Sequence, residues 1–147
     1  MRALVQRVSS GAVCVGTEQL GAIGKGLVIL LGVTHADTAA DVDFLAEKCV
    51  NLRIFADEAG KMNRSLADLG GAALIVSQFT LYADCSHGRR PGFAEAAPPE
   101  QAERLYDLFV DRVKRSGIGV ATGRFGAEMQ LEIHNDGPVT LLVESRK

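Results

Sequence analysis

Apolar positions recur along the chain with two different periods, and these periods predict its secondary structure. Residues 2–15 alternate between apolar and polar and are rich in valine, and residues 26–33 form a nearly continuous apolar run. Alternation is typical of a half-buried β-strand, whereas an uninterrupted run indicates a central strand covered on both faces. We therefore expect the first thirty residues to form two strands joined by a glycine-rich turn.

From residue 37 the apolar spacing changes to that of an amphipathic helix. This helix is predicted to begin at Asp37 or Thr38 and to pack one stripe on the sheet. The stripe consists of Val42, Leu45, Cys49 and Leu52. A second helix is predicted to begin after Pro98-Pro99, with basic residues in its last turn and Gly117 as its stop.

Three further stretches have the pattern of strands. Residues 72–79 and 118–125 are largely apolar. Residues 129–143 alternate on either side of Asn135-Asp136-Gly137, which is typical of a β-hairpin turn. The order β, β, α, β, α, β, β, β predicts a single α/β domain over residues 1–147, in which a mixed sheet carries two main helices.

Pro138 directly follows the glycine of this turn. Proline has no N–H to donate to a sheet, so at the head of a strand it requires an edge, a bulge or a special purpose. Because only about 5–6% of X-Pro bonds in folded proteins are cis, the stretch by itself predicts an ordinary trans turn.

Composition narrows the class of protein. A chain of 147 residues can bury a core without help from disulfides or metals. Its three cysteines lack the C-x-x-C spacing of zinc and redox sites, so neither a metal nor a cofactor is predicted. The chain shows no signal peptide, and its longest apolar run, 27–33, is too short to span a bilayer. A cytoplasmic protein without a membrane partner is expected.

Charge argues against an extended nucleic-acid interface. Sixteen basic and eighteen acidic residues give a formal net charge of −2, which is not typical of a protein that holds many phosphates, and no DNA partner is predicted. Two local basic clusters, 87–92 and 111–117, are consistent either with contacts to a few phosphates or with a solvated loop and a helix end.

The usual catalytic signatures are missing. The chain has no G-x-S-x-G, no H-E-x-x-H and no phosphate-binding loop. Its histidines, His35, His87 and His134, lie in separate segments, and a lone histidine is more often a surface or capping residue than a base.

One polar segment follows an apolar strand. Ser77, Gln78 and Thr80 lie where the chain leaves the sheet, a place where α/β folds often put binding groups. Hydroxyl, amide and backbone N–H groups there are suited to an oxyanion site. A strand end whose hydroxyls cap a turn is the alternative.

The stretch SQFTL at 77–81 and the stretch NDGPVT at 135–140 together resemble the pair of signature motifs of the D-aminoacyl-tRNA deacylases. RALVQRV at 2–8 and TGRFGAEM at 122–129 are similar to that family as well. The resemblance implies a curled, barrel-like sheet and a homodimer with its active site at the subunit interface. It also implies hydrolysis of the ester in D-aminoacyl-tRNA and in glycine mischarged to tRNA, with L-aminoacyl esters rejected, so that the chain acts in proofreading.

The same resemblance assigns roles to individual residues. It implies that the catalytic pocket is formed by Ser77, Gln78, Phe79 and Thr80. It implies that Gly137 and Pro138, joined by a cis bond, enter that pocket from the other subunit and select by chirality. The candidates for packing on the terminal adenosine are Phe125, Ala127 and Met129. The candidates for supporting the Gly-Pro turn are Arg7 and Asn135. Plain core packing is the alternative for these residues.

Several mechanisms remain open on the sequence. The resemblance implies that the neighbouring ribose 2′-hydroxyl takes part in the reaction, so that the protein mainly positions the ester. Thr80 is then either a nucleophile or a supporting residue. Two rival hypotheses are a small-molecule ester or amide hydrolase with Ser77 or Thr80 as nucleophile, and an RNA-binding or structural dimer without chemistry.

Overall fold

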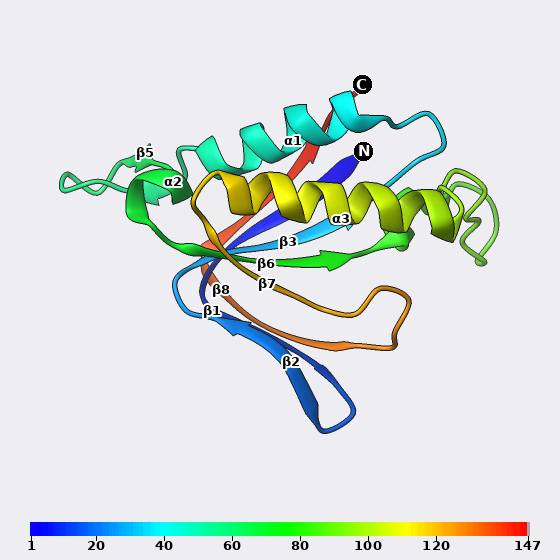
Figure 1. The fold of residues 1–147 in the computed structure, drawn as a ribbon, viewed down its shortest axis with the longest axis horizontal. Helices are drawn as coiled ribbons and strands as arrows, with labels where there is room; N and C mark the ends of the chain where they lie inside the picture. Colours follow the sequence, from blue (N-terminus) through cyan, green and yellow to red (C-terminus); the bar gives the residue numbers. More distant parts are fainter. Residues whose placement is uncertain (147) are drawn as a thin grey trace.

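A computed structural model describes residues 1–146, in which one curled sheet carries two long helices on the same face (Figure 1). The six strands of this sheet are β1 (Arg2–Val15), β2 (Glu18–Ile23), β3 (Gly26–Gly32), β6 (Ala72–Ser77), β7 (Gly119–Thr122) and β8 (Gln130–Glu144). They are arranged in the order β2-β1-β3-β6-β7, and β8 pairs with β1. Because β3, β6 and β7 are parallel while β1 is antiparallel to its neighbours, the predicted mixed sheet is confirmed.

The apolar strand β3 lies at the centre of the sheet, as its sequence predicted. Leu27, Ile29 and Leu31 belong to the core beneath the helices. Val28 belongs to a second cluster on the opposite face, and Leu30 packs against that cluster. A strand buried on both faces has no solvent-facing side, which explains its uninterrupted apolar run.

The two predicted helices are confirmed as α1 (Ala39–Asn51) and α3 (Pro99–Arg115). Thr38 is the N-cap of α1 and forms a capping box with Asp41, which accounts for the start of that helix. Pro99 occupies the first turn of α3, where its missing N–H costs nothing. Within residues 1–146, no helix is both long and apolar enough to cross a membrane.

The sheet curls until its two ends approach each other, which confirms the expected barrel-like shape. A Cβ placed on Gly21 of β2 would lie 3.0 Å from the Cβ of Ala121 on β7. The curl encloses the second apolar cluster, which Val8 and Val13 of β1 join. Val8 and Val13 lie on the same face although five positions separate them, because the register of β1 shifts between Val8 and Ser10.

Several elements were not predicted. The glycine-rich turn contains a strand of its own, β2. The segment between α1 and β6 contains β4 (Phe55–Ala56), β5 (Met62–Arg64) and the short helix α2 (Leu66–Leu69). These elements are short or largely exposed, so their sequences carry little apolar periodicity. The expected strands at 72–79 and 118–125 are also shorter, because β6 ends at Ser77 and β7 at Thr122.

The predicted hairpin at 129–143 is wrong. Both of its halves form one strand, β8, that runs antiparallel to β1 from the Arg2–Glu144 pair to the Cys14–Gln130 pair. Between the pairs Gln6–Thr140 and Val8–Asn135, one residue of β1 faces four residues of β8, 136–139. The Asn-Asp-Gly-Pro sequence therefore forms a bulge in a continuous strand, and the chain does not reverse there.

Candidate functional site

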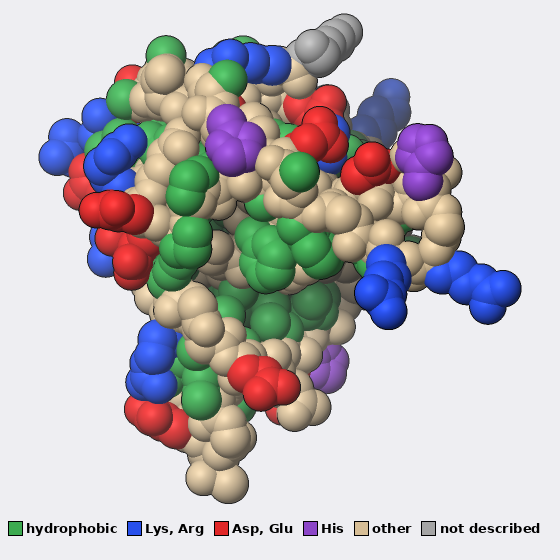
Figure 2. Space-filling model, turned by 90° about the vertical axis from the view of Figure 1, so that its right-hand side faces the viewer, with side chains coloured by type: hydrophobic (Ala, Val, Ile, Leu, Met, Phe, Trp, Pro, Cys, Tyr) green, Lys and Arg blue, Asp and Glu red, His purple; other side chains and the backbone are tan. Residues whose placement is uncertain are grey.

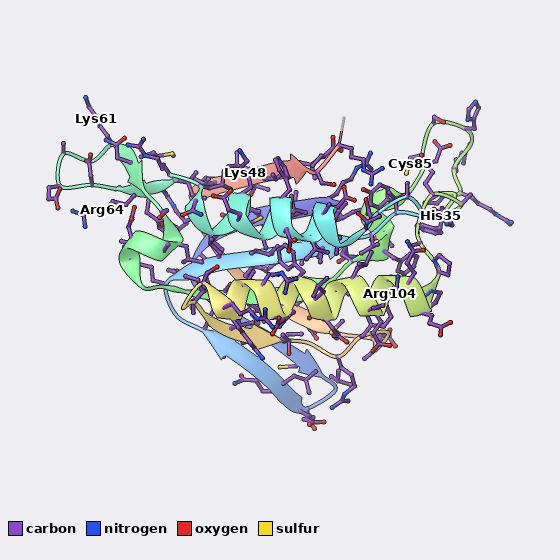
Figure 3. All side chains as sticks on the ribbon, turned by 45° about the horizontal axis from the view of Figure 1, so that its top comes forward. His35, Lys48, Lys61, Arg64, Cys85 and Arg104 are labelled. Atoms are coloured by element: carbon purple, nitrogen blue, oxygen red, sulfur yellow. The ribbon has the colours of Figure 1, made fainter. Side chains whose placement is uncertain are left out.

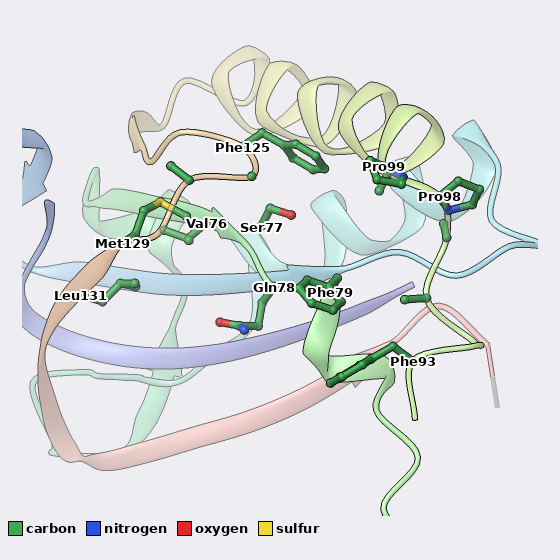
Figure 4. A pocket seen from close by; sticks show the side chains of 15 residues that line it. Val76, Ser77, Gln78, Phe79, Phe93, Pro98, Pro99, Phe125, Met129 and Leu131 are labelled. Atoms are coloured by element: carbon green, nitrogen blue, oxygen red, sulfur yellow. The ribbon is translucent and has the colours of Figure 1, made fainter. Parts of the chain in front are cut away.

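A cleft of about 600 Å³ opens between the end of β6, the segment before α3 and the loop after β7. Figure 2 shows a hollow on this side of the molecule in which hydrophobic side chains gather. The cleft is lined by Val76, Ser77, Gln78, Phe79, Phe93, Ala96, Ala97, Pro98, Pro99, Ala102, Phe125, Gly126, Ala127, Met129 and Leu131. In Figure 4 the Ser77 side chain lies between those of Phe125 and Phe79.

The end of β6 sets the position of the polar segment. Ser77 pairs with Leu31, and the Gln78 N–H donates to the Leu31 carbonyl at 2.8 Å, so the segment is held by the central strand. The chain then enters the 3₁₀ turn η1 (Phe79–Tyr82). The first bond of this turn joins the Leu81 N–H to the Gln78 carbonyl at 3.2 Å, which leaves the N–H groups of Phe79 and Thr80 without acceptors inside the turn. Such a pair of adjacent N–H groups is suited to bind an oxyanion.

Thr80 differs from the other residues of the segment. Ser77, Gln78 and Phe79 line the cleft, whereas Thr80 is exposed and is not among the lining residues. Its hydroxyl accepts a hydrogen bond from Nε2 of Gln78 at 2.5 Å. The Thr80 side chain thus holds the amide of a lining residue.

Aromatic side chains shape two sides of the cleft. The rings of Phe79 and Phe93 meet edge to face with centroids 5.1 Å apart, and both are partly exposed, at 55% and 40%. On the opposite side Phe125 lies 6.2 Å from Tyr106 of α3, measured between ring centroids. The Tyr106 hydroxyl donates to the Ile75 carbonyl of β6 at 2.6 Å, and burial raises the pKa of this tyrosine. Tyr106 therefore connects α3, β6 and the cleft wall.

The three predicted adenosine-packing residues, Phe125, Ala127 and Met129, line the same cleft as Ser77. The loop that carries them turns at Gly126, whose φ is 76°. Met129 packs so closely on Gly123 that a Cβ there would lie 2.5 Å from its sulfur atom. These contacts bring one apolar wall opposite the polar segment.

No titratable side chain is among the residues that line the cleft. The histidines lie elsewhere: His35 is bonded to the Ala94 carbonyl, His87 to Ser86, and His134 is on β8. Within residues 1–146, no three His, Cys, Asp or Glu side chains gather in a way that could hold a metal ion. The cleft thus offers hydroxyl, amide and backbone groups, and neither an acid nor a base.

Gly137 and Pro138 lie outside this cleft, in the exposed β8 bulge, and the bond between them is cis. The trans turn expected from the stretch alone is therefore wrong, and the cis bond implied by the family resemblance is present. Arg7 holds the bulge: its Nε donates to the Asp136 carbonyl at 3.2 Å and its Nη1 to the Ile54 carbonyl at 2.6 Å.

Asn135 closes the bulge from the other side. Its Nδ2 donates to the Thr140 hydroxyl at 2.9 Å, and its Oδ1 accepts from the Val139 N–H at 3.3 Å. The bulge is therefore braced at both of its ends. The structure thus divides the predicted site residues into two groups, those at the cleft and those at the β8 bulge.

These two groups are far apart within one chain. Ser77 pairs with Leu31, which pairs with Ala3 of β1, whereas the bulge lies beside Arg7, four residues further along β1. Four residues of strand span about 13 Å, and β3 and β1 both lie between β6 and β8. The bulge of a chain therefore does not reach its own cleft.

The sequence did not reveal the wall formed by Phe93 and the segment Ala96–Pro99. This wall is joined to the sheet by the Ala97 N–H, which donates to the Val33 carbonyl at 2.9 Å. The one available signal was Phe93, an isolated aromatic residue in a polar loop. A single exposed aromatic residue is common on protein surfaces, so this signal was too weak to predict the wall.

Comparisons with known proteins agree with one another. A family model described as D-Tyr-tRNA(Tyr) deacylase matches residues 4–144. A protein of Roseiflexus sp. named D-aminoacyl-tRNA deacylase is 60% identical, with 99% of this chain and 94% of that protein aligned. One of the same name from Clostridioides difficile is 58% identical, with 100% and 99% aligned.

Two solved structures are similar over nearly their full length. The structure titled c-Myc DNA Unwinding Element Binding Protein is 43% identical, with a TM-score of 0.95 and full coverage of both chains. A probable eukaryotic D-amino acid tRNA deacylase is 17% identical, with a TM-score of 0.86 and coverage of 97% and 98%. The second similarity is one of fold.

Proposed function

The chain belongs to the D-Tyr-tRNA(Tyr) deacylase family and hydrolyses the ester bond of D-aminoacyl-tRNA, and we propose that it does so in the cleft at the end of β6. This location rests on one observation. The backbone N–H groups of Phe79 and Thr80, which have no acceptor inside their turn, occur beside a cleft whose lining has no titratable side chain. Such a site can hold and polarise an ester that is already reactive.

The reaction requires little from the protein beyond placement. An aminoacyl ester is activated by its own α-ammonium group, and the ribose 2′-hydroxyl lies next to the ester oxygen. The oxygen of water forms a bond to the carbonyl carbon, the bond from that carbon to the ribose oxygen breaks, and the ribose oxygen leaves with a proton. The N–H groups of Phe79 and Thr80 bind the negative charge that develops on the carbonyl oxygen.

The terminal adenosine occupies the apolar wall of the cleft. Phe125 and Met129 pack on the base, and Ala127 between them leaves room for it. Gln78, held by Thr80, orients the aminoacyl group. This assignment gives these four lining residues contacts with the aminoacyl end of the tRNA and none with the amino-acid side chain.

Chirality is read by the β8 bulge of a second subunit. Gly137 and Pro138 of that subunit present their carbonyls to the α-carbon of the substrate, so that an L side chain collides with them while a D side chain points to solvent. Glycine has no side chain to collide and is accepted. Arg7 and Asn135 keep the bulge in place. The separation of bulge and cleft within one chain supports supply from a partner.

A homodimer requires an open surface that matches itself. Among the described residues, β8 pairs only with β1, so its other edge is free, and Leu141 and Leu142 beside the bulge are 37% and 55% exposed. An open strand edge with exposed leucines is a natural place for a second copy to pair. We place the dimer interface there, and the enzyme in the cytoplasm.

DNA is not part of this proposal, although one structural relative is titled a DNA-unwinding-element binding protein. The formal net charge of −2 does not favour a long duplex. In a gel-shift assay at 150 mM salt we expect no complex with duplex DNA at micromolar protein. A stable complex would add a second function.

Deacylation of matched D-tyrosyl-, L-tyrosyl- and glycyl-tRNA, measured with chelator present, tests the proposed function. We expect rapid loss of the D and glycyl esters and background loss of the L ester. Equal background rates for all three would favour a binding protein without chemistry.

Substitution of Thr80 separates positioning from nucleophilic catalysis. Thr80→Ala removes the hydroxyl that holds Gln78 but leaves the backbone N–H, so we expect substantial activity to remain. We expect Ser77→Ala to retain substantial activity as well. Loss of all turnover in either variant would instead identify a nucleophile, as in the rival hydrolase mechanism.

A further inference from the structure

A basic loop adjoins the cleft, and its two ends are both tied to cleft-lining segments. Asp84 follows η1, and Gly92 precedes Phe93. These two residues exchange backbone hydrogen bonds of 2.7 and 2.9 Å, which closes residues 85–91 into a loop at the mouth of the cleft. The base of the loop is therefore fixed beside the cleft.

The charge of this loop is uncompensated. It contains Arg89 and Arg90, both exposed, and neither forms an ion pair with any residue in 1–146. The nearby carboxylate of Asp84 accepts hydrogen bonds from the N–H and hydroxyl of Ser86 at 2.9 and 2.5 Å. These bonds lower the pKa of Asp84, and its carboxylate forms no ion pair with either arginine.

Two other arginines near the cleft lie beside acidic side chains. Arg124, next to Phe125, lies 3.5 Å from Glu18. Arg104 lies on a separate groove between α1 and α3, together with Asp107 and Asp111. Arg89 and Arg90, in contrast, have no ion-pair partner within residues 1–146 and are available for an anionic ligand. Figure 2 shows basic side chains projecting beside the hydrophobic hollow.

We propose that Arg89 and Arg90 bind phosphates of the single-stranded 3′ end of tRNA, just before the adenosine that occupies the cleft. This inference rests on the proposed function and names the protein side of its contact with tRNA. Arg90 lies three residues from Phe93, at most about 11 Å of chain, and the arginine side chain extends the reach further. Arginine is also the side chain best matched to phosphate geometry.

A local contact of this kind reconciles RNA binding with a net acidic chain. The enzyme needs to neutralise only the few phosphates that precede the terminal nucleotide, while the rest of the tRNA stays away from its surface. The loop then draws the acceptor end to the cleft and contributes to substrate binding rather than to the chemical step.

The test compares two substrates, D-tyrosyl-tRNA and the D-tyrosyl ester of adenosine, which lacks the preceding phosphates. For the double variant Arg89→Ala with Arg90→Ala, we expect the ratio of kcat/KM for tRNA to that for the adenosine ester to fall about tenfold, mainly through KM. The slope of log kcat/KM for tRNA against log salt should become shallower by about 1.4, because each phosphate contact on a single strand contributes about 0.7.

Two further variants serve as controls. Lys48→Ala with Lys61→Ala removes the same charge from exposed positions away from the loop, which Cys85 marks in Figure 3. It should leave the ratio unchanged. Arg89→Lys with Arg90→Lys keeps the charge and should restore most of the ratio.

The outcomes are distinct. The inference would be overturned if the alanine substitutions of Arg89 and Arg90 left the ratio unchanged or lowered kcat/KM equally for both substrates. It would also be overturned if Lys48→Ala with Lys61→Ala lowered the ratio by the same factor. If the wild-type enzyme hydrolysed neither substrate, the proposed function itself would be overturned.

Discussion

Residues 77–80 and the β8 bulge are both short departures from a strand, but the chain supports them in different ways. The first continues β6, is tied to the central strand by Gln78, and faces the chain's own cleft. The second is an exposed bulge held by the side chains of Arg7 and Asn135, and it lies outside that cleft. In the dimer that we propose, the first group serves the cleft of its own chain and the second serves the cleft of the partner. One chain would then contribute to two different sites.

Mixing two variants tests this division most strongly. Ala127→Trp fills the cleft, and Gly137→Ala places a Cβ 2.8 Å from the Arg7 guanidinium at a φ of 120° that favours glycine. Each variant alone should lose at least about a hundredfold in D-tyrosyl-tRNA hydrolysis. Co-expression at equal amounts should restore about a quarter of wild-type activity, because half of the dimers then carry one intact site. A mixture as inactive as its parents would mean that the bulge does not act across subunits.

Removal of the support beneath the bulge should have the next largest effect. Arg7→Met deletes the hydrogen bonds to Asp136 and Ile54, so we expect kcat/KM for D-tyrosyl-tRNA to fall about tenfold and the D-to-L rate ratio to fall with it. Arg53→Met is the matched control, since Arg53 also donates to a backbone carbonyl, that of Asn63 in β5 at 2.9 Å, and forms no hydrogen bond with the bulge. Equal losses in the two variants would show that Arg7 has no special role.

Loss of a hydrogen bond that supports the cleft wall should mainly lower the stability of the protein. Tyr106→Phe leaves the Ile75 carbonyl in the core without its side-chain donor, which should lower the free energy of unfolding by about 1–3 kcal/mol. Because the bulge is untouched, the D-to-L rate ratio should stay at its wild-type value. Urea unfolding and paired rate measurements check both statements, and a changed ratio would mean that the two regions are coupled.

A change remote from both regions should leave activity unaltered and lower only the free energy of unfolding, most at neutral pH and least in acid. Arg146 donates to Asp41 at 2.9 and 2.7 Å and holds the pKa of that carboxyl well below its ordinary value. A lowered native pKa contributes stability above the ordinary pKa, about 4, and this contribution is lost as the pH falls further. Arg146→Ala should therefore lower the free energy of unfolding by about 1 kcal/mol at pH 7, with the difference shrinking below pH 4. A difference that grows in acid would contradict the assignment.

Short-range patterns were sufficient for much of the fold. The limits of α1 and α3 follow from Thr38, Pro99 and the spacing of apolar residues, and the position of β3 follows from its uninterrupted apolar run. The polar segment that begins at Ser77 was found at the end of a buried strand, where the structure also has it. In each case the signal and the interaction that produces it lie within a few residues of each other.

Tertiary contacts decided the rest. Residues 129–143 carry the pattern of a hairpin, yet the length of β1 offers them one partner throughout, so they pair with it as a single strand. Phe93 enters the cleft because a loop closed at Asp84 and Gly92 brings it beside Phe79. The distance between the bulge and the cleft likewise depends on strand order. Local sequence determines how a segment is bent and which face is apolar, but its partner is chosen by residues far along the chain, through contacts that no local period records.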